Sequence, residues 1–314
     1  MLPLKKNFFV AQGGIQNPHR GQPQVIVIGN FDGVHLGHQE LLRKAREVAD
    51  LKRLPGVVVT FDPHPMAILR PPHLRLFDLA DQQAQFAKSG LDGVVYLSFS
   101  RDFSELSAGA FVDQILGPEF RPAALVVGFN FRFGAGRTGT TELLRDWGAQ
   151  NNCEVHVVGP VRQSEAPLST SEIRKQLQQG EVKKAAELLG RPYYLSGIVI
   201  HGDSRGRGIG FPTANLHLEK VVTPEWGVYA TRTWVAGRAV DSVTHLGPLP
   251  TFGDEVVRLE THLLDFSGDL YGQTVRVEFM DRVRSVAKFS SIEELRIQIQ
   301  KDVETARMLL GSAR

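Results

Sequence analysis

Apolar runs and amphipathic stretches alternate along the first 190 residues of the chain. The apolar runs are expected to be strands, at 25–28, 57–61, 94–97, 125–127 and 155–158. Helical spacing of apolar residues predicts helices after His35, near 80–89, 105–116 and 141–150, and over the pair 171–179 and 181–189. Strands that are apolar throughout and alternate with helices predict a parallel sheet covered on both faces. Residues 1–22 are expected to be irregular.

A helix stop at 190–192, which reads GRP, separates this pattern from a different one. Strand candidates then follow without helices between them, at 195–201, 227–233, 238–245, 256–265 and 273–280. Closely spaced strands joined by Gly, Asp and Pro turns predict an antiparallel barrel or sandwich. One helix over about 292–310 closes the chain, and Ser291 with Glu294 predicts a capping box at its start. We therefore expect two domains, 1–190 and 191–314.

Composition and charge exclude several classes of protein. The 314 residues suffice for two cores, and 42% hydrophobic with 22% charged residues is ordinary for a globular protein. With 36 basic and 34 acidic side chains, the chain lacks the electrostatic signature of a nucleic-acid binder. It has no apolar run as long as a membrane span, no signal-peptide pattern, and a single cysteine. We expect a cytoplasmic protein without a nucleic-acid or membrane partner.

The first strand runs into the stretch 29–38, which reads GNFDGVHLGH. A strand, a tight turn and a helix start leave unpaired backbone N–H groups and a positive dipole end, where a phosphate binds well. Because His35 and His38 are three residues apart, they share one face of the helix and can converge on one anionic group. Two alternatives stay open, namely a pair of metal ligands and two histidines packed without a role.

Two loops follow later strands of the same expected sheet. They read FDPHP at 61–65 and GFNFRFG at 128–134. Ligands bind at the carboxyl ends of parallel strands, so both loops are expected on the ligand-binding edge. The three aromatic residues at 129, 131 and 133 are suited to embrace a planar ring system. The alternative is that they anchor the loop in the hydrophobic core.

Hydroxyl and amide groups mark two further stretches. The segment 168–174, LSTSEIR, places three hydroxyls and Arg174 at a helix start, where they are either caps or ligands of a polyphosphate. The glycine-rich stretch 202–215 ends in PTAN. There the Thr213 hydroxyl and the Asn215 amide oxygen suit a hard cation shared with nucleotide phosphates. A flexible surface turn is the alternative for this stretch.

These motifs together resemble bacterial bifunctional riboflavin kinase/FAD synthetases. The string GNFDGVHLGHQ at 29–39 is similar to their adenylyltransferase signature, and GRGIGFPTAN at 206–215 is similar to their riboflavin kinase signature. The resemblance implies a Rossmann-like nucleotidylyltransferase domain with a parallel sheet, then an antiparallel riboflavin-kinase β-barrel with a terminal helix. It also implies the reactions: phosphorylation of riboflavin to FMN by ATP with Mg²⁺, and adenylylation of FMN to FAD with release of pyrophosphate.

The resemblance assigns roles to residues of the first domain. His35 and His38 are expected to stabilise charge on the α-phosphate of ATP. Nucleotide and phosphate contacts are expected from Asn30, Gly33, Asn130, Ser169, Thr170, Ser171 and Arg174. Flavin contacts are expected from Phe61, Pro63, His64, Phe129 and Phe131. The hydroxyls at 169–171 differ in order from the family motif but keep its chemistry.

In the second domain, the resemblance implies a site for ATP phosphates at Gly210, Thr213 and Asn215, with Thr213 and Asn215 also binding Mg²⁺. Glu260 matches the family's catalytic base, which accepts the proton of the ribityl 5′-hydroxyl. The alternative for this residue is an exposed strand glutamate. Arg284 matches an arginine near the flavin and the nucleotide.

One departure from the family pattern lies at 245–251, which reads HLGPLPT. The family usually has asparagine-x-glycine-x-arginine-proline-threonine here, and Leu249 supplies no cation. Either Arg258 or Arg282 takes the place of the missing arginine, or the kinase is weakened. Two further interpretations therefore stay open, an FMN adenylyltransferase alone and a flavin-binding module that does no chemistry. The oligomeric state has no signature in the sequence.

Overall fold

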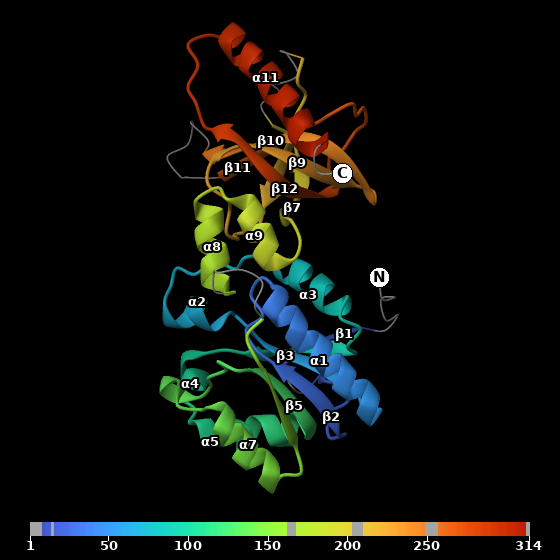
Figure 1. Cartoon of the computed structure of the whole chain (residues 1–314), viewed down its shortest axis with the longest axis vertical. Helices are drawn as coiled ribbons and strands as arrows, with labels where there is room; N and C mark the ends of the chain where they lie inside the picture. Colours follow the sequence, from blue (N-terminus) through green and yellow to red (C-terminus); the bar gives the residue numbers. More distant parts are fainter. Residues whose placement is uncertain (1–7, 14–15, 162–167, 203–209, 249–256, 312–314) are drawn as a thin grey trace. The chain divides into compact units, whose positions relative to one another are not determined.

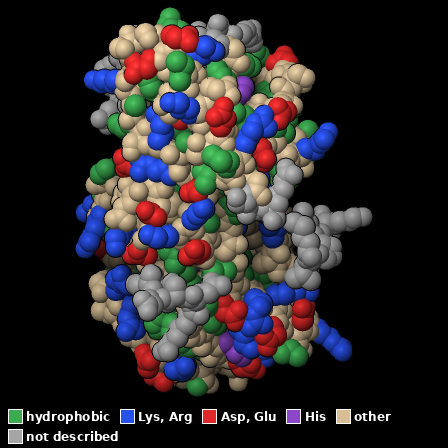
Figure 2. All heavy atoms as spheres, turned by 45° about the horizontal axis from the view of Figure 1, so that its top comes forward, with side chains coloured by type: hydrophobic (Ala, Val, Ile, Leu, Met, Phe, Trp, Pro, Cys, Tyr) green, Lys and Arg blue, Asp and Glu red, His purple; other side chains and the backbone are tan. Residues whose placement is uncertain are grey.

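The structure is a computed structural model that describes residues 8–13, 16–161, 168–202, 210–248 and 257–311 (Figure 1). The chain divides into two compact units, Met1–Leu168 and Ser169–Arg314. On the face drawn in Figure 2, basic and acidic side chains intermingle, as their nearly equal numbers lead us to expect. Among the described helices, none combines the length and the apolar character that crossing a bilayer requires.

A six-stranded parallel sheet forms the first unit, in the order β1-β4-β3-β2-β5-β6. Its strands are β1 (Phe9–Gln12), β2 (Gln24–Ile28), β3 (Gly56–Asp62), β4 (Gly93–Ser98), β5 (Pro122–Gly128) and β6 (Glu154–Val158). The parallel sheet and the strands β2 to β6 confirm the prediction. The expectation that 1–22 is irregular is wrong at β1, which pairs with β4 at the sheet edge. Four residues are too few to show a strand period, so the pattern did not reveal this strand.

Helices cover both faces of this sheet, as the apolar strands predict. They are α1 (Leu36–Lys52), α2 (Pro65–Leu69), α3 (Leu79–Ala87), α4 (Arg101–Ser104), α5 (Ala108–Ala110), α6 (Gly117–Phe120) and α7 (Thr141–Gln150). Successive strand residues point to opposite faces. Val25 and Val27 accordingly pack with Leu42 of α1 in one core cluster, whereas Ile26 packs with Trp147 of α7 in the other.

The helix expected near 105–116 lies at 108–120, where α5, a π-helical segment and α6 follow one another without a break. The Ser107 hydroxyl accepts a hydrogen bond from the N–H of Ala110 and caps α5, which begins three residues after Glu105. A π-helical segment, Phe111–Leu116, then leads into α6. Pro118 in α6 has no N–H to donate, so regular α-helical hydrogen bonding cannot continue through this point.

Six antiparallel strands close into a barrel in the second unit, in the order β10-β11-β8-β7-β12-β9. They are β7 (Tyr193–Ile200), β8 (Ala214–Leu218), β9 (Gly227–Val235), β10 (Arg238–Pro248), β11 (Val257–Leu263) and β12 (Thr274–Ser285). The helices described in this unit are α8 (Thr170–Gln178), α9 (Val182–Leu189) and α11 (Ile292–Gly311). The barrel alternative is confirmed over the sandwich. The predicted strands did not include β8, because its first residues belong to the PTAN motif.

The two faces of the barrel strands carry different side chains. Five hydroxyls line the interior and hydrogen bond to one another, from Thr231, Thr233, Ser242, Thr244 and Thr261. The hydroxyls of Thr233 and Thr261 lie 3.3 Å apart although β10 lies between their strands. Such a short distance is possible only on the concave side of a curved sheet, so these side chains face the interior. The outer face packs against α11 through Val228, Val243, Val303, Ala306 and Leu310. Ser291 caps α11 as predicted, because its hydroxyl accepts the N–H of Glu294 at 3.1 Å.

Candidate functional site

The turn between β2 and α1 has an unusual backbone. Phe31, Gly33 and Val34 have φ angles of 49°, 82° and 40°, in the left-handed region that β-branched residues rarely adopt. Glycine takes this conformation at no steric cost, whereas Phe31 and Val34 are held in it by the packing of their fully buried side chains. Strained turns persist where the surrounding structure determines them, and they cluster at functional sites. Asn30 is exposed in the same turn, and its carbonyl accepts the Thr60 hydroxyl.

The two histidines of the motif converge as their spacing predicts. Their rings stack with centroids 3.7 Å apart and an angle of 16° between the planes. His35 caps α1, because its Nδ1 accepts the backbone N–H of His38 at 3.3 Å. A Cβ on Gly37 would lie 3.2 Å from the His35 ring, so glycine leaves room for this stack. With Nδ1 of His35 accepting, the proton of the neutral ring lies on Nε2, which makes this atom a hydrogen-bond donor.

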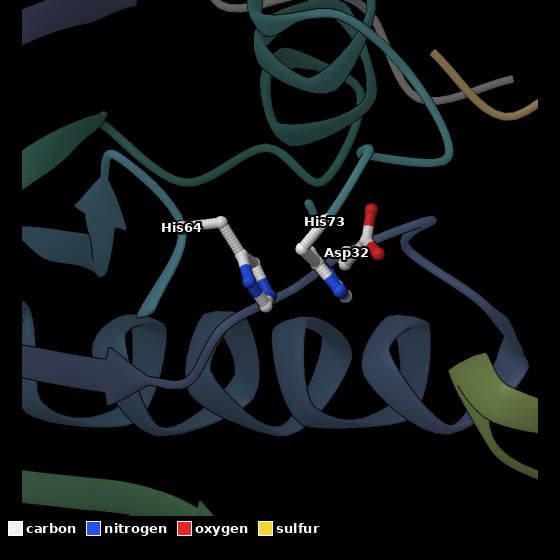
Figure 3. A group of neighbouring side chains, drawn as sticks. All are labelled: Asp32, His64 and His73. Atoms are coloured by element: carbon white, nitrogen blue, oxygen red, sulfur yellow. The ribbon is translucent and has the colours of Figure 1, made fainter. Parts of the chain in front are cut away.

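A second group of polar side chains lies at the same edge of the sheet. Asp32 of the β2–α1 turn, His64 after β3 and His73 after α2 offer atoms that all lie within 4.8 Å of one another. Figure 3 shows these three side chains gathered above α1. In the described part of the chain, this is the one group of three or more such residues close enough to hold a metal ion. Sequence reasoning missed it, because residues 32, 64 and 73 form no recognisable spacing.

The hydrogen bonds of this group favour a donor site over a metal site. His64 caps α2, and its Nδ1 accepts the N–H of Met66 at 3.1 Å, which leaves the proton on Nε2. A protonated Nε2 has no lone pair for a metal. Asp32 Oδ1 accepts the N–H of Leu76 at 2.8 Å. Mg²⁺ also prefers oxygen ligands to imidazoles, so these residues do not fit this ion.

The aromatic loop after β5 divides into an anchor and an exposed part. Phe133 is buried, and Phe131 stacks on it with ring centroids 5.6 Å apart. These two rings pack against the core, as the anchor interpretation expects, and the flavin contact expected of Phe131 stays a prediction. Phe129 is 50% exposed, and Asn130 beside it is also exposed. Their predicted contacts with flavin and nucleotide stay predictions.

The loop after β3 also begins with an aromatic residue that packs on the core. Phe61 contacts Phe99 and Phe103, with ring centroids 5.7 and 6.0 Å away, and is partly buried against the core. Pro63 follows the strand directly, and His64 caps α2, which begins at Pro65. The expectation that this loop lies at the carboxyl end of its strand is confirmed, because β3 ends at Asp62. Flavin contacts of Phe61, Pro63 and His64 stay predictions.

The hydroxyl stretch before α8 belongs to the second unit. Ser169 caps the helix, because its hydroxyl accepts the N–H of Glu172 at 3.2 Å. The capping interpretation is therefore confirmed for Ser169. Thr170, Ser171 and Arg174 lie in the first two turns of the helix, and the phosphate contacts expected from all four residues stay predictions.

A row of polar side chains crosses three strands of the barrel. Glu260 on β11 is paired in register with Asn215 on β8 and with His245 on β10. Asn215 is 7% exposed, and its Oδ1 accepts no hydrogen bond from the described residues. Thr213 is partly buried just before β8, and Gly210, with a φ of 91°, precedes it. A buried amide oxygen without a donor fits an oxygen-binding cation such as Mg²⁺.

The two candidates for the missing arginine have different surroundings. Arg258 Nη1 lies 3.6 Å from Glu260 Oε1, so this cation stands beside the candidate base. Arg282 instead donates from Nη2 to the carbonyl of Trp226 at 2.9 Å and packs against Gly180. Leu249 itself lies outside the described residues. The structure therefore favours Arg258 as the cation of this site.

Arg284, for which a flavin contact was expected, takes part in an ion pair. Its Nε and Nη2 donate to both carboxylate oxygens of Asp302 on α11, at 2.8 to 3.0 Å. Nη1 donates to the carbonyl of Ser285, and the guanidinium lies 5.6 Å from the centre of the Phe289 ring. Arg284 thus fastens β12 to α11, and its contact with flavin stays a prediction.

Comparison with known proteins identifies the family. The FAD synthetase family model matches residues 17–172, and the riboflavin kinase family model matches residues 189–310. A bifunctional riboflavin kinase/FMN adenylyltransferase of Haemophilus influenzae is 38% identical over 303 residues, which cover 95% of this chain and 98% of that protein. Its namesake in Bacillus subtilis is 38% identical over 290 residues and covers 90% of this chain and 91% of that protein.

A solved structure supports the fold. The crystal structure of a protein from Streptococcus pneumoniae, described as a macrolide-efflux protein, is similar with a TM-score of 0.84 and 33% identity. The match covers 96% of this chain and 98% of that one. Two family models follow one another along the chain, and the sequence relatives match over nearly their whole length. The chain therefore belongs to the family of bifunctional riboflavin kinase/FMN adenylyltransferases.

Proposed function

We propose that this chain makes FAD from riboflavin in two steps, with one active site in each unit. The second unit transfers a phosphoryl group from ATP to riboflavin, giving FMN and ADP. The first unit joins AMP from a second ATP to FMN, giving FAD and pyrophosphate. The observation that carries the proposal is the presence of two separate polar constellations, the stacked histidines of α1 and the row that contains Glu260. The order of the two matching family models supports it.

In the second unit, Glu260 acts as the general base. Its side chain is 32% exposed, so a substrate hydroxyl can reach it. The carboxylate takes the proton of the ribityl 5′-hydroxyl while the hydroxyl oxygen bonds to the γ-phosphorus and the bond to ADP breaks. Asn215 Oδ1 and the Thr213 hydroxyl are the atoms that would hold Mg²⁺. When bound, this ion supplies neutralisation of the phosphate charges.

In the first unit, a phosphate oxygen of FMN attacks the α-phosphorus of ATP, and pyrophosphate leaves. This nucleophile is already an anion, so the reaction requires no base. The imidazoles of His35 and His38 stabilise the charge on the α-phosphate, with the Nε2–H of His35 as a donor. The exposed Phe129 and Asn130, with the loop at 61–64, contact flavin and nucleotide.

The proposal assigns residues 1–190 to FAD formation and 191–314 to FMN formation. The matched segments 17–172 and 189–310 support this division, although the helices α8 and α9 cluster with the barrel. The proposal also includes a cytoplasmic location, the compartment that keeps thiols such as the single Cys153 reduced.

The test follows FMN and FAD by chromatography after the purified protein receives riboflavin, ATP and Mg²⁺. FMN is expected first and FAD later. FAD from supplied FMN, but no FMN from riboflavin, would leave the adenylyltransferase alone. Neither product would leave a flavin-binding module without chemistry.

Single variants then separate the two sites. His38→Ala is expected to lower FAD formation from supplied FMN by about 10²- to 10³-fold, and to spare FMN formation. Glu260→Gln is expected to lower FMN formation by about 10²- to 10⁴-fold, and to spare FAD formation. His156→Ala on β6 and Glu293→Gln on α11 serve as matched controls in the same two units. Equal loss of both activities in either single variant would overturn the proposal of two independent sites.

A further inference from the structure

His245 occupies a position beside the candidate base that the proposed reaction does not use. In the β10–β11 register it lies directly opposite Glu260, which in turn lies opposite Asn215 in the β11–β8 register. Side chains opposite each other in antiparallel strands have Cβ atoms about 4.5 to 5.5 Å apart on the same face. The imidazole is therefore an immediate neighbour of the carboxylate, on the side away from Asn215.

Among the charged groups around His245, Glu260 is the one whose charge acts on the imidazole without being cancelled. The described groups that act on it are Glu260 of β11, Arg284 of β12 and Asp302 of α11. Arg284 and Asp302 form a closed ion pair at 2.8 Å, so their effects on the imidazole largely cancel. Strand β9 places the apolar Val228 opposite His245. The Glu260 carboxylate also has a cation on its own strand, because Arg258 Nη1 lies 3.6 Å from Glu260 Oε1.

Burial of this imidazole sets its charge. Burial lowers the pKa of His245 below its ordinary value of 6.5; Arg284 lowers it further, whereas Glu260 and Asp302 act in the opposite direction. The ring is consequently neutral at neutral pH. The neutral ring then covers one side of the Glu260 carboxylate and keeps water from it, and places no positive charge there.

We propose that His245 is a positioning residue for riboflavin phosphorylation, and that its protonation converts the Glu260 carboxylate from a proton acceptor into half of an ion pair. This inference rests on the proposed kinase function. A neutral ring leaves the carboxylate lone pairs available to the substrate hydroxyl. An imidazolium opposite Glu260 would attract the carboxylate and weaken it as a base. FMN formation therefore falls in acid as His245 takes up its proton.

The test compares the pH dependence of FMN formation in the wild type, His245→Asn and His245→Gln. Both amides keep a polar side chain at this position but cannot take up a proton. We would measure kcat and KM for riboflavin from about pH 5 to about pH 8.5, with each protein normalised to its own maximum. His201→Asn is the matched control, because His201 belongs to the same unit and stacks on Tyr271 instead of pairing with Glu260. FAD formation from supplied FMN, measured in the same samples, reports that each variant is folded.

The expected result is a shallower acid limb of kcat/KM in both amide variants, with the wild type and His201→Asn steeper. Towards the acid end of this pH range the normalised wild-type rate should fall below that of both amide variants. Parallel acid limbs in the wild type and both variants would overturn the inference, even if the variants lost activity at every pH. Absence of FMN from the wild type at every pH, with FAD still formed from FMN, would instead overturn the kinase proposal and the inference with it.

Discussion

The ion pair between Arg284 and Asp302 allows a test that separates stability from chemistry in the second unit. Asp302 is 3% exposed, and its carboxylate accepts hydrogen bonds from Arg284 Nε and Nη2 and from Gln298 Nε2. The change is Asp302→Ala. It removes every one of these acceptors and leaves the guanidinium without its counter-charge between β12 and α11.

The size of the effect follows from this burial. Removing one partner of a buried ion pair costs about 3 to 5 kcal/mol in the free energy of unfolding. The Arg284 side chain is 22% exposed, so water can partly solvate the remaining charge and we expect the lower end, about 3 kcal/mol. For a unit of this size, such a loss lowers the midpoint of thermal unfolding by about 10 °C. The double variant Arg284→Met/Asp302→Leu should recover most of the loss, because it leaves neither charge buried.

The assay combines thermal unfolding with both activities. After Asp302→Ala, FMN formation from riboflavin should disappear at a lower temperature than FAD formation from supplied FMN, because the two units have separate cores. A loss below about 1 kcal/mol, the value of an exposed pair, would refute the reasoning. A double variant as unstable as Asp302→Ala would refute it too. The loss in the free energy of unfolding would then come from altered packing and not from an unpaired buried charge. An unchanged midpoint with a raised KM for riboflavin would show instead that Arg284 serves the flavin.

Two further predictions concern single side chains. Asn215→Ala should raise the KM for MgATP in FMN formation by about 10- to 100-fold, the value of a hydrogen bond to a charged group, and leave FAD formation from FMN unchanged; equal losses in steady-state assays of both reactions would contradict this. Burial raises the pKa of the Cys153 thiol from 9.0 to about 12, so the thiol stays protonated at pH 8 and should react with an aromatic disulfide only as fast as the protein unfolds. Because the folded-state pKa is the higher one, this group's contribution to stability is complete below its ordinary pKa and is lost as the pH rises from about 9 towards 12. Fast labelling of the folded protein would contradict the assignment.

The fold was predictable where apolar periodicity is long enough to read. Strands β2 to β6 and helix α1 could be predicted, because core positions impose their spacing on the sequence. In α1 the buried residues are Leu41, Leu42, Ala45, Val48 and Ala49. Strand β1 was missed because four residues at an edge show no period. Strand β8 was missed for another reason: its first residues also carry the chemistry of the PTAN motif, and polar functional residues conceal a strand pattern.

The candidate sites were predictable only in part, because spacing along the chain reports local geometry. The stack of His35 on His38 follows from a separation of three residues on one helix face. The group of Asp32, His64 and His73 depends on loops from different strands, so tertiary structure alone brings it together. The same holds for His245, whose neighbour Glu260 is fixed by strand register. For Arg284 the sequence carried no sign of Asp302, its partner on a different element.

The polar groups of the two proposed sites differ, and the difference matches the nucleophiles of the two proposed reactions. In the first unit, helix capping leaves the Nε2–H of His35 and of His64 as donors, which stabilise an anion but do not take up its proton. In the second unit, the row Asn215–Glu260–His245 includes an amide oxygen that accepts no hydrogen bond from the described residues, which suits a cation, and a carboxylate, which suits a hydroxyl proton. A phosphate nucleophile is already ionised near neutral pH, whereas a hydroxyl has to lose its proton in the reaction. Mild acid should therefore slow the phosphorylation of riboflavin more than the adenylylation of FMN. Under these conditions the supply of FMN, and not its adenylylation, would limit FAD formation.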